Sequence, residues 1–144
     1  MQSLAANTRT TIVPSLRHRD APAAIDWLCR TFGFEQHVVY ADADIVHHAQ
    51  LTFGNGMIML GSTDNGSAWG KRSAQPDEIG GRETHSCCVI VEDCDAHHAR
   101  AVAAGAVIVD PLETKEYGGQ GYSCLDPEGH LWWFGSYDPW KETQ

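Results

Sequence analysis

The sequence predicts an α+β fold made of two tandem βαβββ modules, and three observations support this prediction. Each half of the 144-residue chain contains a strand-like apolar run, an amphipathic helix and three further strand-like runs, in that order. An aspartate precedes both predicted helices, at Asp20 and Asp93, and a glycine follows both, at Gly33 and Gly105. A repeat of half the chain length indicates a duplicated structural unit. We treat residues 1–144 as one domain built from two such units.

The first module is predicted over residues 10–63. Its helix begins after Asp20, whose carboxylate suits an N-cap, and carries apolar side chains at helical spacing along one stripe. This stripe comprises Ile25, Leu28, Cys29 and Phe32. The strands are expected at residues 10–16, 36–40, 45–53 and 57–61. The glycine-rich residues 54–56 predict a hairpin between the last two strands.

The second module is predicted over residues 85–138, followed by a tail at 139–144. Its helix follows Asp93, and small apolar residues repeat the helical stripe. The strands are expected at residues 86–91, 107–110, 121–125 and 130–135. Residues 64–84, between the modules, are polar and glycine-rich, so we predict a linker or lid loop there.

Composition excludes two classes of partner. The chain carries 19 acidic and 10 basic residues, a formal net charge of −9. A phosphate backbone or an anionic membrane requires a basic face, so we expect no nucleic-acid and no membrane partner. Residues 1–11 lack the apolar segment of a signal peptide, and no run approaches the roughly 18 apolar residues of a membrane-spanning helix. The five cysteines are odd in number and irregularly spaced, and without an export signal we expect reduced thiols and a cytoplasmic location. They contain no Cys-x-x-Cys pair, so we expect no structural zinc site.

Two motifs resemble those of a known family. Residues 126–132 read Asp-Pro-Glu-Gly-His-Leu-Trp before the last strand, and residues 23–27 precede Gly33 and Phe34 at the end of the first helix. Together with the duplicated βαβββ pattern, they make the chain resemble the vicinal oxygen chelate superfamily of glyoxalases, extradiol dioxygenases, and fosfomycin- and bleomycin-resistance proteins. The resemblance implies that both modules form one curved mixed-sheet cup for a small molecule, with helices on its convex face. It also implies a homodimer, the commonest oligomer geometry.

Metal-dependent members of that superfamily hold a divalent ion through four side chains, typically His, Gln or Glu, on four strands. The corresponding positions here hold residues that are poor ligands for such an ion, namely Val13, Met59, Ser86 and Trp133. Only His85 lies beside one of these positions, and a shift of one residue would turn it to the opposite face of its strand. The resemblance therefore implies a small-molecule site that contains no metal and no cofactor.

Period-two alternation along the strands predicts which side chains line the site. In residues 45–53 one alternating set is the more apolar, so we assign the other set, with His48 and Gln50, to the site. The predicted ligand-binding residues are Ser15, His48, Gln50, Met59, Ser86, Cys88, Tyr122 and Trp133. Trp69 and Tyr117 are predicted to form a lid or rim. This aromatic and sulfur-rich lining favours a planar guest.

Three functions fit these residues to different degrees. We favour a non-enzymatic protein that binds a planar, drug-like or aromatic metabolite, as the bleomycin-resistance branch does. The alternative is a metal-independent enzyme in which His48 or Gln50 is the polar residue that takes part in the reaction. A metal-dependent glyoxalase or dioxygenase is disfavoured by the missing ligands. Ser123, His130 and Asp126 lie close in sequence, but no nucleophile elbow accompanies them, so a hydrolase triad is not expected.

Overall fold

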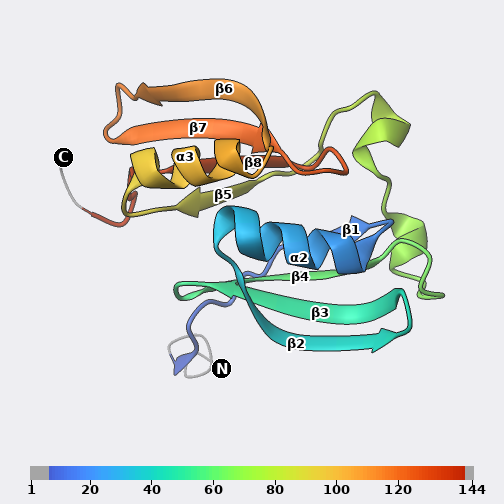
Figure 1. Ribbon diagram of the computed structural model, residues 1–144. Helices are drawn as coiled ribbons and strands as arrows, with labels where there is room; N and C mark the ends of the chain where they lie inside the picture. Colours follow the sequence, from blue (N-terminus) through green and yellow to red (C-terminus); the bar gives the residue numbers. More distant parts are fainter. Residues whose placement is uncertain (1–6, 142–144) are drawn as a thin grey trace. The chain divides into compact units, whose positions relative to one another are not determined.

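A computed structural model describes residues 7–141 and divides the chain into two compact units, residues 1–74 and residues 75–144. Over the described residues, each unit has a four-stranded sheet with an α-helix between its first two strands, α2 in the first unit and α3 in the second (Figure 1). The strand orders, β1-β4-β3-β2 and β5-β8-β7-β6, are the same when written from the first strand of each unit. The predicted duplication of a βαβββ module is therefore confirmed.

In the first unit, β1 pairs with β4 in parallel, and β4–β3 and β3–β2 are antiparallel. The elements are β1 (Ser15–His18), α2 (Ala21–Phe32), β2 (Glu35–Asp42), β3 (Ile45–Phe53) and β4 (Gly56–Ser62). Helix α2 begins where Asp20 accepts a hydrogen bond from Ala23 N at 3.2 Å, and it ends at Gly33, whose φ of 90° is left-handed. Both ends match the caps predicted from the sequence.

The second unit repeats this arrangement, with β5 and β8 parallel and the other pairs antiparallel. Its elements are β5 (Cys87–Ile90), α3 (Cys94–Ala103), β6 (Val107–Thr114), β7 (Gln120–Leu125) and β8 (Leu131–Gly135). Two short 3-10 helices, η1 (Gly70–Arg72) and η2 (Pro76–Ile79), lie in the segment that the sequence predicts as a linker. In the described part of the chain, no helix is long and apolar enough to cross a membrane.

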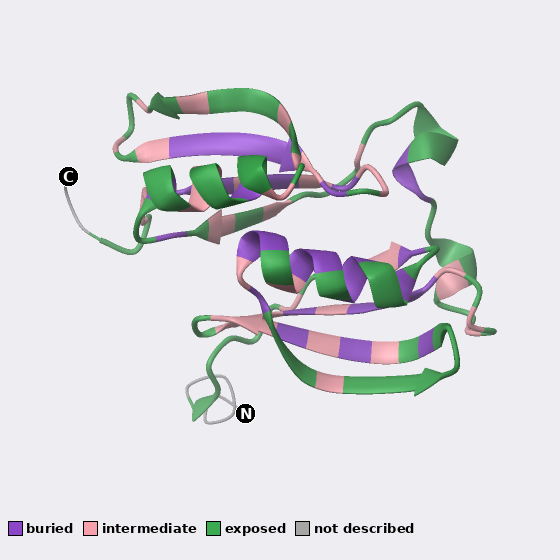
Figure 2. Cartoon of the chain, in the orientation of Figure 1, coloured by how far each residue is buried: buried purple, intermediate pink, exposed green. Residues whose placement is uncertain are grey.

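Each helix packs on one face of its own sheet, and the buried side chains gather there (Figure 2). In the first unit, Ala49 and Leu51 of β3 are fully buried in this layer. In the second unit, the layer contains Tyr122, Cys124, Trp132 and Phe134, all fully buried. We call the opposite face of each sheet its helix-free face.

The first strand begins later than predicted. The sequence places it at residues 10–16, whereas β1 spans Ser15–His18. Pro14 precedes it and has no N–H to donate, although its carbonyl accepts a hydrogen bond from Met59 N at 2.8 Å. Before this point Ile12 is 85% exposed. The apolar residues of this run therefore do not all belong to a strand.

Candidate functional site

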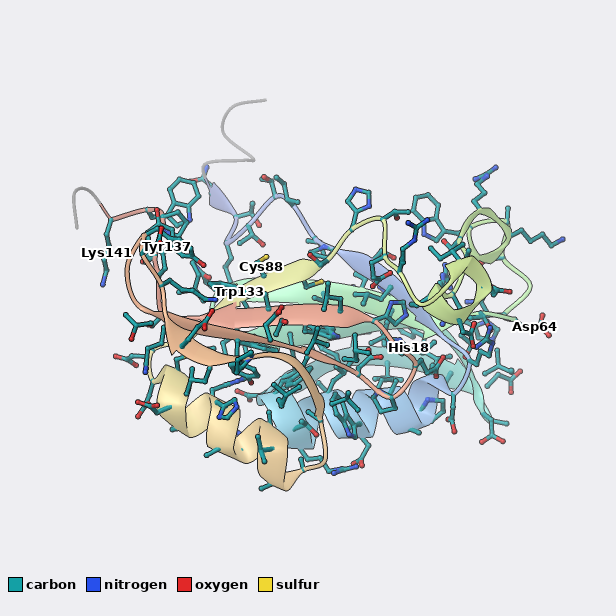
Figure 3. All side chains as sticks on the ribbon, turned by 90° about the horizontal axis from the view of Figure 1, so that it is seen from above. His18, Asp64, Cys88, Trp133, Tyr137 and Lys141 are labelled. Atoms are coloured by element: carbon teal, nitrogen blue, oxygen red, sulfur yellow. The ribbon has the colours of Figure 1, made fainter. Side chains whose placement is uncertain are left out.

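The helix-free face of the second sheet carries a row of side chains across its four strands. Cys88 on β5 pairs with Trp133 on β8, and Trp133 pairs with Ser123 on β7. Ser123 pairs in turn with Asp110 on the edge strand β6. Because paired residues of neighbouring strands point to the same side, these four side chains share one face. Figure 3 shows Cys88 and Trp133 on the side of the sheet away from α3.

The indole of Trp133 lies over two glycines. A Cβ added at Gly121 would lie 2.8 Å from Cζ2 of Trp133, and one added at Gly135 would overlap the same ring. Any larger residue at either position would displace the indole. Trp133 itself is only half-buried. The second sheet therefore carries a partly exposed aromatic platform on its helix-free face.

Tyr122 lies on the other face. The sequence includes it among the ligand-binding residues, but it pairs with Phe134 and is 0% exposed beneath α3. Its hydroxyl lies 2.6 Å from Nδ1 of His97, and its ring stacks on Phe134 with centroids 5.6 Å apart. Burial raises the pKa of Tyr122 well above its ordinary value. Tyr122 is thus a core residue, and its assignment to the site is corrected.

Two neighbouring cysteines differ in environment. Cys88 is exposed on the helix-free face beside Trp133, whereas Cys87 points to the other side and is half-buried. Burial is the main cause that raises the pKa of Cys87 to about 11. Cys88 is therefore the thiol that a reagent or a guest on the Trp133 face meets first.

The helix-free face of the first sheet is more polar. Ser15 pairs with Met59, and Met59 pairs with Gln50, so these three predicted residues are neighbours. Nε2 of Gln50 lies 3.0 Å from Nε2 of His48, and the imidazole stacks on Tyr40 with centroids 6.4 Å apart. The amide of Gln50 and the imidazole of His48 are thus in hydrogen-bond contact.

Sequence reasoning missed Tyr40 and Arg17 on this face. Arg17 lies over Gly61, and its Nη1 donates to the carbonyl of Ser62 at 3.3 Å. Desolvation lowers the pKa of this guanidinium below its ordinary value. In both units, therefore, a glycine of the last strand lies beneath a large side chain, Gly61 beneath Arg17 and Gly135 beneath Trp133.

The other predicted residues lie at the margins. Ser86 precedes β5 and is exposed, and Trp69, next to η1, is also exposed. Tyr117, in the β6–β7 turn, contacts Tyr137 edge-on with centroids 5.0 Å apart. The roles of Trp69 and Tyr117 as a lid or rim stay predictions.

The residues at the family's metal positions do not fit a divalent ion. Val13 lies outside β1, Met59 and Trp133 offer no hard donor, and Ser86 is a lone hydroxyl. Among residues 7–141, no group of three or more His, Cys, Asp or Glu side chains is arranged to hold a metal. These four positions therefore provide no set of side-chain ligands for a Lewis-acid metal ion.

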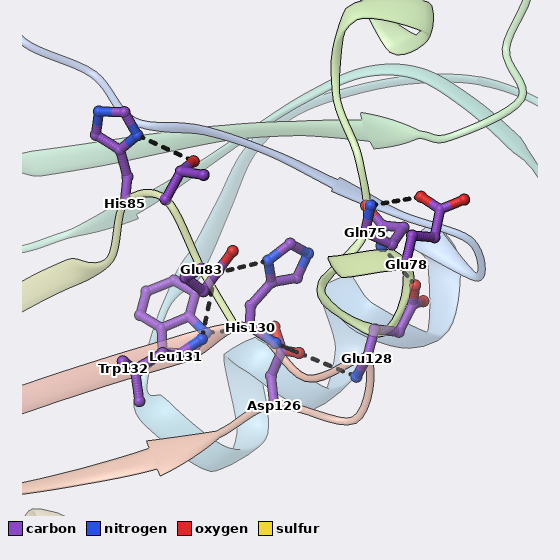
Figure 4. A network of polar contacts seen from close by, with 10 residues as sticks. Gln75, Glu78, Glu83, His85, Asp126, Glu128, His130, Leu131 and Trp132 are labelled. Atoms are coloured by element: carbon purple, nitrogen blue, oxygen red, sulfur yellow. Dashed lines mark hydrogen bonds and ion pairs between the residues drawn. The ribbon is translucent and has the colours of Figure 1, made fainter. Parts of the chain in front are cut away.

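The Asp-Pro-Glu-Gly turn is organised by Asp126, which is buried. Its Oδ1 accepts from Glu128 N and His130 N at 3.0 and 3.1 Å, and its Oδ2 accepts from Nε1 of Trp132 at 3.3 Å (Figure 4). Ser123, by contrast, is bonded to the carboxylate of Asp110, and the carboxylate of Asp126 is bonded to backbone donors of its own turn.

Residues 75–83 are attached to the same turn. Gln75 donates to Oε1 of Glu128 at 3.2 Å, and Oε2 of Glu83 accepts from Leu131 N at 3.3 Å (Figure 4). The same Glu83 oxygen lies 3.0 Å from Nδ1 of His130. This part of the predicted linker is therefore an ordered component of the second unit.

Comparisons with known proteins agree with this architecture. The model of the Glyoxalase/Bleomycin resistance protein/Dioxygenase superfamily matches residues 10–134, and the chain belongs to this superfamily. The solved structure of TioX from Micromonospora sp. ML1 is 35% identical with a TM-score of 0.69, over 88% of this chain and 97% of that one. The uncharacterized protein MT0910 of Mycobacterium tuberculosis is 30% identical over 92% of this chain and 78% of its own length.

A more distant structure shares the fold alone. A mutant of the fosfomycin resistance protein FosX from Listeria monocytogenes, complexed with Mn(II) and a dihydroxypropylphosphonic acid, has a TM-score of 0.63 at 14% identity. The match covers 88% of this chain and 89% of that one. That protein's metal is a property of its own residues, because one scaffold hosts many chemistries.

Proposed function

We propose that this protein binds a planar aromatic small molecule without a metal. The observation that carries the proposal is the indole of Trp133, which lies over Gly121 and Gly135 and is half-exposed on the helix-free face. An aromatic ring that is already oriented loses little conformational entropy when a second ring stacks on it. The superfamily's metal chemistry has no donors here, which favours binding over metal-dependent catalysis.

Tryptophan fluorescence and the rate of Cys88 alkylation test this proposal together. Proflavine and acridone, two three-ring compounds, are titrated into the protein, and the intrinsic tryptophan fluorescence is followed. A guest that stacks on Trp133 quenches its emission and also slows alkylation of the neighbouring Cys88 by iodoacetamide. If neither probe binds by calorimetry nor protects Cys88, the proposal is wrong.

Variants assign the signal to one tryptophan. Trp133→Ala removes the platform and should weaken binding by about tenfold, because both stacking and buried area are lost. Trp140→Phe is the matched control, since Trp140 is 88% exposed and lies outside the sheet. This control should leave the affinity unchanged. An equal loss in both variants would contradict a site on Trp133.

The metal-free state is tested separately. Protein purified without chelator should contain no stoichiometric Zn, Ni, Mn or Fe, and EDTA should leave its melting temperature unchanged. One tightly held ion per chain, with a melting temperature that falls on chelation, would overturn this part of the proposal.

A metal-independent enzyme is the second candidate, and the His48–Gln50 contact favours it. An imidazole that is held beside a hydrogen-bonding amide has the chemistry of a general acid or base. His48→Ala and Gln50→Leu should then abolish turnover in a screen of glyoxalase-like lyase and isomerase substrates. Binding without turnover in wild-type protein favours the first candidate.

We also propose that the chain forms a homodimer, because isologous pairing is the commonest oligomer geometry. Sedimentation equilibrium should report twice the chain mass of 15.8 kDa. A monomer at micromolar concentration would contradict this proposal.

A further inference from the structure

The net charge of the chain is not shared between its two units. Residues 75–144 contain thirteen Asp and Glu against four Lys and Arg, which gives −9, whereas residues 1–74 contain six of each, which gives zero. The whole net charge of −9 therefore belongs to the unit that carries the Trp133 platform. This distribution would attract a cation to the second unit, but it does not by itself define a site.

One carboxylate of this unit is directed onto the Trp133 face. The β6–β7 ladder shifts register on both sides of Asp110, between Ile108 and Asp110 and again between Asp110 and Glu113. Such bulges at a sheet edge turn a side chain away from the regular alternation. Asp110 is consequently paired with Ser123, in the same row as Trp133.

Ser123 holds Asp110 in that position. Its hydroxyl accepts from the backbone N–H of Asp110 at 3.1 Å and donates to Oδ2 of the same residue. Ser123 is only 3% exposed, so its geometry is set by packing, whereas Asp110 is exposed. Within residues 7–141, no hydrogen bond or ion pair uses Oδ1 of Asp110, which leaves this oxygen for a guest.

The distance between Asp110 and Trp133 allows one ligand to contact both side chains. Asp110 and Trp133 are two strands apart, about 10 Å at the usual separation of neighbouring strands. A fused three-ring system that stacks on the indole can therefore place a charged substituent at Asp110. The nearby cation, Lys115, is paired with Glu113 at 3.0 Å.

We infer that the guest of the Trp133 face is a planar aromatic cation, whose ring stacks on Trp133 and whose positive charge is bound by Asp110. This inference rests on the proposed binding function and adds the charge of the ligand. The indole contributes to the same selectivity, because the face of a tryptophan ring attracts cations. A neutral ring of equal shape gains the stacking but not the ion pair.

Proflavine, a planar cation, and acridone, a neutral ring system of similar shape, separate these contributions by calorimetry. We expect wild-type protein to bind proflavine more tightly than acridone. Asp110→Asn should weaken proflavine binding by about fivefold and leave acridone unchanged, because only the ion pair is lost. Lys115→Gln should have the opposite effect and strengthen proflavine binding, since a competing positive charge is removed.

The matched control is Glu92→Gln, which removes one exposed negative charge from the same unit between β5 and α3. If this control weakens proflavine binding as much as Asp110→Asn does, the attraction comes from net charge and the inference is wrong. Equal affinity for both probes, unchanged by Asp110→Asn, also overturns it while leaving the binding function intact. If neither probe binds or protects Cys88, the binding function itself has failed.

Discussion

The indole of Trp133 lies over the backbone of Gly135, two residues further along the same strand, so closely that a Cβ at Gly135 would overlap the ring. Gly121 supports the same ring from β7. The platform therefore depends on two missing side chains as much as on the tryptophan. Adding a methyl group at Gly135 tests this dependence.

Gly135→Ala should destabilise the protein by about 1–3 kcal/mol, because the added methyl group forces the indole out of its position. In a Trp133→Phe background the same change should cost less, since the smaller ring leaves room. Urea unfolding of the two single variants and the double variant measures this coupling. Gly56→Ala is the control, because its nearest neighbour to an added Cβ is the Phe53 carbonyl at 3.4 Å. Strictly additive effects would show that ring and glycine do not interact.

The five thiols should react at very different rates. Cys88 is exposed, whereas Cys29 and Cys87 are half-buried and Cys94 and Cys124 are buried. Burial also raises the pKa of Cys87 to about 11. At pH 8 in native buffer, an aromatic disulfide reagent should therefore show a fast phase from Cys88. Cys88→Ser should remove that phase, and Cys87→Ser should keep it. A fast phase that survives Cys88→Ser would place the reactive thiol elsewhere.

Alkaline pH should weaken the fold through Cys124. Burial, with a smaller contribution from Asp126, raises the pKa of this thiol from about 9 to about 12. The folded state thus keeps a proton that the unfolded chain releases, so the stabilisation is complete below pH 9 and is lost as the pH rises towards 12. The expected loss is about 1.4 kcal/mol per pH unit in this window. Unfolding in urea at several pH values measures the slope, and Cys124→Ala should reduce it.

Several local features could be predicted from the sequence because they depend on neighbouring residues. The caps at Asp20 and Gly33 follow from short-range backbone chemistry, and the duplication follows from spacing alone. The face of Trp133 follows from alternation, which the sheet preserves through β8. Tyr122 was misplaced because alternation was not carried through the Asp-Pro-Glu-Gly turn. Pairing across that turn matches Ser123, rather than Tyr122, with Trp133.

Other features lie beyond local patterns. The contacts of Arg17 with Gly61 and of Tyr40 with His48 join different strands. The orientation of Asp110 depends on two register shifts, of which Pro111 marks only the second in the sequence. The linker was predicted as a loop because its composition is polar, but Gln75 and Glu83 make hydrogen bonds to a turn about 50 residues away.

Asp126 should be the most sensitive polar position of the second unit. Three donors, two from the backbone and one from Trp132, share its carboxylate inside the turn. Asp126→Ala removes the acceptor of these three hydrogen bonds and should cost about 2–4 kcal/mol, because hydrogen bonds to a buried charged group contribute strongly to stability. Asp126→Asn retains one carbonyl oxygen and should cost less. Urea unfolding followed by far-ultraviolet circular dichroism measures both, with Glu92→Gln as a charge-matched control. If the alanine variant is as stable as the control, the turn is held by its backbone alone.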